Sequence, residues 1–143
     1  MRIRFITLIV ALIAITIAFY SAATAQSQRS VLDGVFTEAQ AARGEQLVSS
    51  YGCSYCHGGG LVGGHEDIPP LVGSDFTGLW DGRPLSDLHK MVSGMPPDTS
   101  DKLSIQGRVD VIAYLLWLNW YPAGEYELPP DPVVLNQIQI VLP

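Results

Sequence analysis

Two thiols and an imidazole lie within five consecutive residues of this chain. Cys53 and Cys56 are separated by two residues, and His57 directly follows the second thiol. At this spacing the two thiols can form thioethers with the two vinyl groups of one porphyrin, and the imidazole can bind the iron. The motif therefore predicts one covalently attached haem c, with His57 as its neutral proximal ligand.

Three other chemistries use the same residue types. A disulfide between Cys53 and Cys56 fits an oxidising compartment. A thioredoxin-like redox pair needs a βαβ setting, whereas this pair follows a helical pattern and precedes three glycines. A closed zinc site normally takes four ligands, and the chain offers two cysteines and the histidines His57, His65 and His89. The motif taken alone leaves all three alternatives open.

A haem iron needs a second axial ligand, and the chain offers few candidates. Beyond the start methionine, Met91 lies in a predicted helix, where we expect it to be buried in the core. Met95 lies in a loop between Gly94 and two prolines, which would hold a thioether at the iron with little loss of entropy. We therefore predict Met95 as the ligand. The alternatives, His65 and His89, would give a bis-histidine haem.

The N-terminus carries an export pattern. A short basic start is followed by an apolar run over residues 5–19 and by a small-residue cleavage site at 23–25. These features predict a signal peptide over residues 1–25 and a periplasmic protein. The alternative is an uncleaved membrane anchor, since residues 3–20 are just long enough to span a bilayer.

The charge of the mature chain limits its partners. Removal of Arg2 and Arg4 leaves six of the eight Lys and Arg against fourteen Asp and Glu, a formal charge of −8. Such an acidic chain without a basic stripe is not expected to bind nucleic acid. Its negative charge favours partners with a basic docking face, and the alternative is that the charge only keeps the protein soluble. No catalytic triad, P-loop or dinucleotide-binding motif is present, so we expect no enzymatic activity from this chain alone.

Apolar residues at helical spacing predict three helices. Thr37 begins a capping box ahead of a helix over residues 38–49. Pro84 can occupy the first turn of a short helix that runs to Val92. Ser104 is a natural cap for the clearest helix, which extends to about residue 119.

The remaining segments lack sustained periodicity. Residues 58–82 are rich in glycine and are expected to form loops, and prolines after residue 119 are expected to interrupt any regular element. We divide the mature chain into a flexible segment at 26–35, a domain at 36–120 and a Pro-rich C-terminal extension at 121–143. The alternating run at 133–143 is expected to lie as a strap on its own domain, with addition to a partner's sheet as the alternative.

The order of these features resembles class I cytochrome c over residues 36–120. The matching features are a helix with Gly44, the motif at 53–57, the segment at 68–73, the Met95 loop and a helix with Tyr114. The resemblance implies an all-α cytochrome c-like fold, in which the terminal helices cross through a glycine–aromatic pair that Gly44 and Tyr114 look like. It also implies haem attachment outside the cytoplasm, which agrees with the export pattern.

The resemblance also implies roles for four further residues. Pro69 would offer its carbonyl to the proximal histidine, and Leu71 would pack on the porphyrin. Trp80 and Arg83 are the candidates for binding a haem propionate. Ordinary packing is the alternative for Trp80, because buried tryptophans commonly have their N–H bonded within the protein.

Two segments are similar to the small cytochrome subunits or domains that accompany quinoprotein dehydrogenases, namely residues 37–44 and 121–129. The expected partners are therefore redox proteins, such as a dehydrogenase, an oxidase or another cytochrome. With His57 and Met95 filling both axial positions, the iron would carry single electrons and bind no substrate. The alternative is a haem enzyme or sensor whose distal ligand dissociates.

Overall fold

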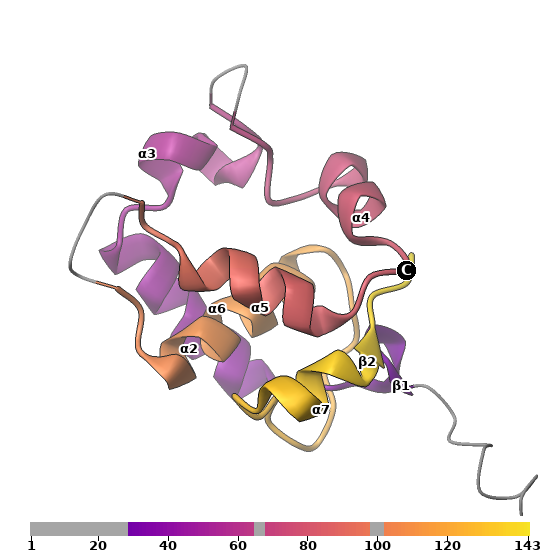
Figure 1. Cartoon of the computed structure of the whole chain (residues 1–143). Helices are drawn as coiled ribbons and strands as arrows, with labels where there is room; N and C mark the ends of the chain where they lie inside the picture. Colours follow the sequence, from indigo (N-terminus) through magenta and orange to yellow (C-terminus); the bar gives the residue numbers. More distant parts are fainter. Residues whose placement is uncertain (1–28, 65–67, 98–101) are drawn as a thin grey trace, which may run out of the picture.

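The part of the chain that the structure describes consists of helices joined by loops, with one two-stranded sheet (Figure 1). The computed structural model describes residues 29–64, 68–97 and 102–143. Its elements are β1 (Arg29–Ser30), η1 (Val31–Asp33), α2 (Glu38–Ser50), α3 (Ser54–His57), η2 (Gly59–Leu61), α4 (Ser74–Trp80), α5 (Leu85–Ser93), α6 (Ile105–Leu118), α7 (Pro132–Asn136) and β2 (Ile138–Gln139). The all-α class predicted from the sequence is confirmed.

Helices α2 and α6 begin at the predicted caps, but the capping box predicted at Thr37 is incomplete, because the Gln40 side chain bonds Leu128 and not the Thr37 N–H. The Thr37 hydroxyl accepts the Gln40 N–H at 3.1 Å, and the Ser104 hydroxyl accepts the Gly107 N–H at 3.0 Å. Each cap satisfies a backbone donor that the first helical turn would otherwise leave unpaired. The observed ends of both helices lie within one residue of the prediction.

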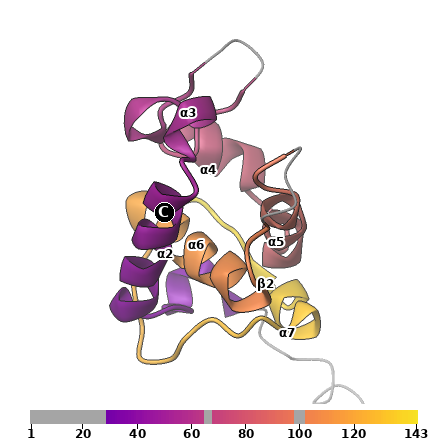
Figure 2. The ribbon, with the colours of Figure 1, turned by 90° about the vertical axis from the view of Figure 1, so that its left-hand side faces the viewer.

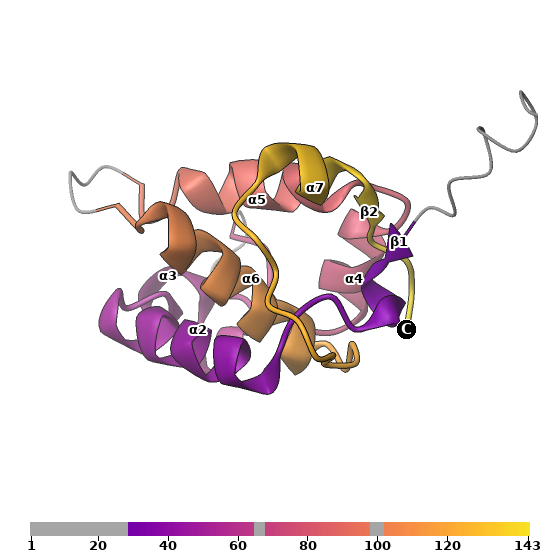
Figure 3. The same ribbon diagram turned by 90° about the horizontal axis from the view of Figure 1, so that it is seen from below.

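The crossing of α2 and α6 is the most extensive contact between elements of the described chain, and the two helices lie side by side in Figures 2 and 3. Gly44 makes it possible. A Cβ at this position would clash with the carbonyl of Asp110 and would lie 2.8 Å from the Cβ of Tyr114. Only glycine lets the backbones approach this closely, so the predicted pairing of Gly44 with Tyr114 is confirmed.

The stretch expected to form only loops contains helix as well. The helix α5 matches the prediction, but α4 and the short η2 lie within residues 58–82, so that part of the prediction was wrong. Phe76, Thr77 and Trp80 are buried on one face of α4. Because α4 has only seven residues and includes Gly78, its periodicity is too short to stand out in the sequence.

The C-terminal extension (residues 121–143) contributes to the same core as the helices. Leu128, Leu135 and Ile140 are fully buried. The expected absence of regular elements there was wrong, because Asp131 caps α7 and Pro132 occupies its first turn, where a missing N–H costs nothing. Strand β2 then pairs in parallel with β1 of the same chain, so the run lies on its own domain as predicted, but residues 133–136 of it are helical and not extended.

The segment before α2 is also part of the packed structure. A flexible segment was expected over residues 26–35, but residues 29–35 form β1, η1 and the lead into α2, with Val31 and Val35 buried. Pairing with β2 and burial of these two valines hold the segment in place. Residues 26–28 and the predicted signal peptide at 1–25 lie outside the described residues.

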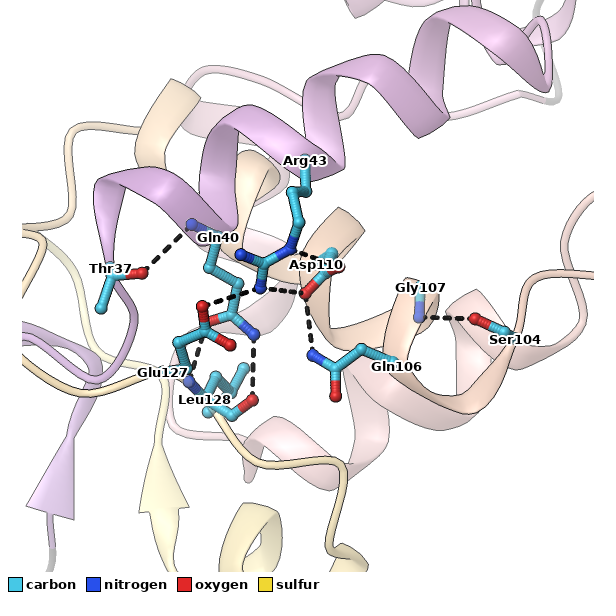
Figure 4. A network of polar contacts seen from close by, with 9 residues as sticks. All are labelled: Thr37, Gln40, Arg43, Ser104, Gln106, Gly107, Asp110, Glu127 and Leu128. Carbon is cyan, nitrogen blue, oxygen red and sulfur yellow. Dashed lines mark hydrogen bonds and ion pairs between the residues drawn. The ribbon is translucent and has the colours of Figure 1, made fainter.

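A polar network fastens the extension to the crossing helices (Figure 4). The buried side chain of Gln40 accepts the Leu128 N–H at 2.8 Å and donates to the Leu128 carbonyl at 3.0 Å. Arg43 pairs with Asp110 on α6 at 3.1 Å and with Glu127 at 2.9 Å. The hydrogen bond with Asp110, and then that with Glu127, raises the pKa of the Arg43 guanidinium, which therefore stays charged.

Candidate functional site

The Cys53–His57 motif forms a single helical turn at the end of α2. The N–H of Cys53 bonds the carbonyl of Val48 at 3.1 Å, which ties the motif to the helix. The N–H groups of Cys56 and His57 both bond the Cys53 carbonyl, at 3.3 and 3.0 Å. Both thiols are free, with Cys53 half-buried and Cys56 exposed. One turn of backbone thus brings together the two thiols and the imidazole that the sequence singled out.

The imidazole of His57 is oriented by the carbonyl of Pro69. Its Nδ1 lies 2.8 Å from the Pro69 oxygen. Because a carbonyl can only accept, Nδ1 carries the proton and Nε2 carries the lone pair. Within the described part of the chain no hydrogen bond engages Nε2. The side chain is therefore held in the tautomer and orientation that a metal-binding imidazole needs.

A glycine-rich loop folds back on the motif after His57. The Gly63 N–H donates to the His57 carbonyl at 2.8 Å. Gly58 has a φ of 78°, and a Cβ there would clash with the Gly63 carbonyl. Glycine is required at this position both for the left-handed backbone and for the close return of the chain.

Met95 lies in the loop between α5 and α6 and is half-buried. Its N–H donates to the Val92 carbonyl at 3.0 Å. The Lys102 ammonium donates to the carbonyl of Gly94 at 3.0 Å and also to that of Pro96. Lys102 thus holds the residues on both sides of Met95.

The other methionine was expected in the core, and that expectation was wrong. Met91 is 54% exposed, because α5 turns Leu85, Leu88 and Val92 to the core and Met91 away from it.

The candidate propionate ligands lie together but already have partners. Trp80 is buried beside Phe76, with their ring centroids 6.4 Å apart. The Arg83 guanidinium lies 4.5 Å from the centre of the Trp80 ring and pairs with Asp87 at 3.0 Å. Ordinary packing of Trp80 therefore accounts for these contacts, and propionate binding stays a prediction.

His89 and His65 are the alternatives to Met95 as the second ligand of the iron. His89 lies on α5, and its Nε2 is buried without a hydrogen-bond partner among the described residues. Burial first, and the charge of Arg108 second, lower the pKa of His89, which is therefore neutral at neutral pH. His65 lies outside the described residues.

Two residues that position these loops were not predicted from the sequence. The buried Asn119 side chain accepts the Gly73 N–H at 2.8 Å and donates to the carbonyls of Leu71 and Leu115 at 2.9 and 2.8 Å, so it fixes the segment that carries Leu71. Lys102 does the same for the Met95 loop. The available signals were an asparagine at the end of an apolar helix and a lone lysine after a proline-containing loop.

Comparison with known families gives a match on the segment that carries these features. Residues 39–115, more than half of the 143-residue chain, match the model of the family described as cytochrome c oxidase, cbb3-type, subunit III. The chain belongs to this family. Its cytochrome c domain implies a covalently bound haem c and a role in electron transfer. Comparisons with curated proteins and with solved structures found no match.

The donor set fits a haem c. Two unpaired thiols and a free imidazole nitrogen lie on one helical turn, and Cys53, Leu71 and Val72 are only partly covered by the core. A porphyrin needs such thiols for its vinyl groups and apolar side chains for its faces. Cys53, Cys56 and His57 would hold the haem, and Leu71 would contact it.

The alternatives for the motif find less support. The thiols do not form a disulfide. Burial raises the pKa of the Cys53 thiol, whereas a reactive redox pair relies on a lowered thiol pKa. Among the described residues no three His, Cys, Asp or Glu side chains gather as a zinc site would require.

The lengths of the helices show whether any of them could span a membrane. In residues 29–64, 68–97 and 102–143, no helix has the length and apolar character needed to cross a bilayer.

Proposed function

We propose that this protein is a periplasmic, mono-haem class I cytochrome c that carries single electrons between redox proteins. The observation that carries the proposal is the bond between His57 and Pro69. It leaves Nε2 free on the same turn as two unpaired thiols. A bound haem c supplies one-electron redox chemistry at its iron.

The chain's own residues hold and tune that group. Thioethers from Cys53 and Cys56 would fix the porphyrin, and the Pro69 carbonyl orients the His57 ring and increases its basicity as a ligand. Met95 would supply a second ligand to the iron from a loop that Lys102 holds on both sides. A thioether raises the reduction potential, and a filled sixth position keeps other molecules from the iron.

The partners follow from family and charge. The family's name assigns its members to an oxidase, so an oxidase or a cytochrome that feeds one is the partner we favour. The formal charge of −8 expected for the mature chain, six Lys and Arg against fourteen Asp and Glu, would steer it toward a basic docking face. Association with a quinoprotein dehydrogenase rests on the two similar segments alone and stays a prediction.

The test of haem attachment is a pyridine haemochrome spectrum. The full chain is exported in a host with haem-attachment machinery, and we expect one haem c per chain. The variants Cys53→Ser and Cys56→Ser each remove one thioether and should shift the spectrum toward that of a haem with one free vinyl group. A colourless protein, or a spectrum unchanged in both variants, would refute the proposal.

A second measurement separates a carrier from a haem enzyme or sensor. Carbon monoxide is mixed with the reduced protein, and binding is followed by absorbance. A carrier with both axial positions filled should bind slowly or not at all. Rapid binding would show a dissociable distal ligand and favour the alternative.

A further inference from the structure

A groove lies between the first half of α2 and the last turns of α6. Its volume is about 300 Å³, and it is lined by Glu38, Ala41, Ala42, Glu45, Tyr114 and Trp117. Figure 3 shows the two helices side by side along this face. The Cys53–His57 motif follows the opposite end of α2, so the α2–α6 groove does not belong to the haem site.

Two stacked aromatic rings form one side of the groove. The ring centroids of Tyr114 and Trp117 lie 6.3 Å apart, and their planes differ by 17°. Trp117 is 49% exposed. Between Glu38 and Glu45 the facing helix presents the small side chains of Ala41 and Ala42, which leave room for a ligand beside the rings. The two rings are nearly parallel, Tyr114 is half-buried, and the exposed Trp117 ring presents the electron-rich face that attracts cations.

The charged groups of the groove are all negative. Glu38 and Glu45 are both exposed and lie two turns apart on α2, so they face the same side. Among the described residues no ion pair engages either carboxylate, because the one basic residue of α2, Arg43, pairs instead with Asp110 and Glu127. Burial first, and the neighbouring Glu45 carboxylate second, raise the pKa of Tyr114, so its ring stays neutral.

We propose that the α2–α6 groove docks an arginine side chain from a segment of a partner protein. The groove is complementary in charge to such a side chain, since two carboxylates without ion pairs lie beside the exposed ring of Trp117 and the half-buried ring of Tyr114. A guanidinium is planar and weakly hydrated, so it can stack on Trp117 while its N–H groups bond Glu45 or Glu38. The volume is at the lower end of the range of about 300–1,000 Å³ for small-molecule pockets, which suits one long side chain.

This docking site goes beyond the proposed electron carrier. It would attach a partner at the end of α2 remote from the motif and would not depend on the ligands of the iron. A second contact of this kind lets a partner hold the protein while the haem side stays free for electron exchange.

The test uses isotope-labelled, reduced holoprotein and two short probes. The amide and indole signals of the groove are followed by NMR during titration with acetyl-Gly-Arg-Gly-amide and with the same peptide carrying citrulline. Citrulline has nearly the shape of arginine but no charge. We expect saturable shifts at Ala41, Ala42 and the Trp117 indole with the arginine peptide only, weakened by added salt.

Variants locate the effect. Trp117→Leu and Glu45→Gln should each weaken binding by about threefold, as expected for one exposed cation–π contact and one exposed ion pair. Trp120→Leu is the matched control, because Trp120 is 89% exposed but does not line the groove, and it should leave binding unchanged.

Four results would overturn the proposal. They are an equal response to citrulline, the absence of saturation, equal losses in the Trp117 and Trp120 variants, and shifts that depend on protein concentration without peptide. The last would identify a second copy of this chain as the occupant.

Discussion

Two regions of this molecule treat their polar groups in opposite ways. In the helical framework (α2, α6 and residues 121–143), Gln40 and Asp110 are buried and fully engaged in pairs across elements. In the motif loops (residues 53–64 and 94–97), two thiols are free and the Nε2 of His57 has no partner among the described residues. In the framework, these buried polar groups are paired with each other and stabilise one arrangement. In the motif loops, the thiols and the imidazole nitrogen stay available to bind a ligand.

The difference separates stability from function. The framework buries a continuous apolar core, and its buried Gln40 and Asp110 are already paired. The motif loops hold each donor by backbone bonds, as the Pro69 carbonyl does for His57. Substitutions in the framework should therefore change the free energy of unfolding, whereas those in the motif loops should change the spectrum, the potential and ligand access.

The largest effect is expected at the helix crossing. In Gly44→Ala the new Cβ would clash with the Asp110 carbonyl and the Tyr114 Cβ. Because the Asp110 carbonyl belongs to the backbone of α6, relieving the clash requires the two helices to move apart. We expect a loss of about 3 kcal/mol in the free energy of unfolding, measured with urea on the holoprotein. The control is Gly78→Ala on α4, where a Cβ meets nothing within 4 Å. It should stabilise the protein by about 0.5–1 kcal/mol, and equal effects of the two would refute this view of the crossing.

The next effect concerns the fastening of the C-terminal extension. Gln40→Leu leaves the buried N–H and carbonyl of Leu128 unpaired, at a cost of about 2–3 kcal/mol. Gln46→Leu on the exposed face of the same helix is the control and should stay within about 0.5 kcal/mol. If both variants unfold at the same urea concentration, the extension is not held by Gln40.

The third prediction concerns Lys102, which holds the loop that carries Met95. Lys102→Met removes the bonds to the Gly94 and Pro96 carbonyls that flank Met95. If Met95 is the iron ligand as proposed, loss of this charged hydrogen bonding, worth about 1–2 kcal/mol, should let it leave the iron more often and raise the rate of carbon monoxide binding by about tenfold. Lys90→Met loses the same charge from the exposed part of α5 and should leave the rate unchanged. If carbon monoxide binds both variants at a similarly raised rate, the loss of a positive charge, and not the loss of the bonds beside Met95, would explain the effect.

The smallest effect is a pH dependence. The folded pKa of His89 lies below its ordinary value of 6.5, because burial and Arg108 disfavour the charged form. The unfolded chain therefore binds a proton more readily, so stability should fall as the pH drops below 6.5. Thermal unfolding at pH 7.5 and at about pH 5.5 should show a larger decrease for the natural protein than for His89→Gln. Equal decreases would mean that His89 does not contribute.

Whether a helix could be predicted from the sequence depended on the length of its apolar pattern. The helices α2 and α6 were predictable because their caps and apolar stripes extend over three turns or more. Helix α4 and helix α7 were missed because five to seven residues carry too little periodicity, and because proline can begin a helix as well as end one. Their formation depends on burial against distant residues, which no local pattern records.

The same contrast holds for the candidate site. The motif and the Gly44–Tyr114 crossing follow from spacing and resemblance, and the Pro69 bond lies where the resemblance placed it. The roles of Asn119 and Lys102 could not be predicted, because each acts on a segment brought close only by folding. Met91 was misplaced because the orientation of a short helix depends on what its other residues bury.

The reduction potential of Met95→Ala tests the central claim most directly. The claim is that His57 and Met95 close both axial positions of one haem and so make the protein an electron carrier. Loss of the thioether should lower the potential by on the order of 0.1 V, and the reduced variant should bind carbon monoxide rapidly. An unchanged potential, with carbon monoxide still refused, would contradict the account and assign the sixth ligand to another residue.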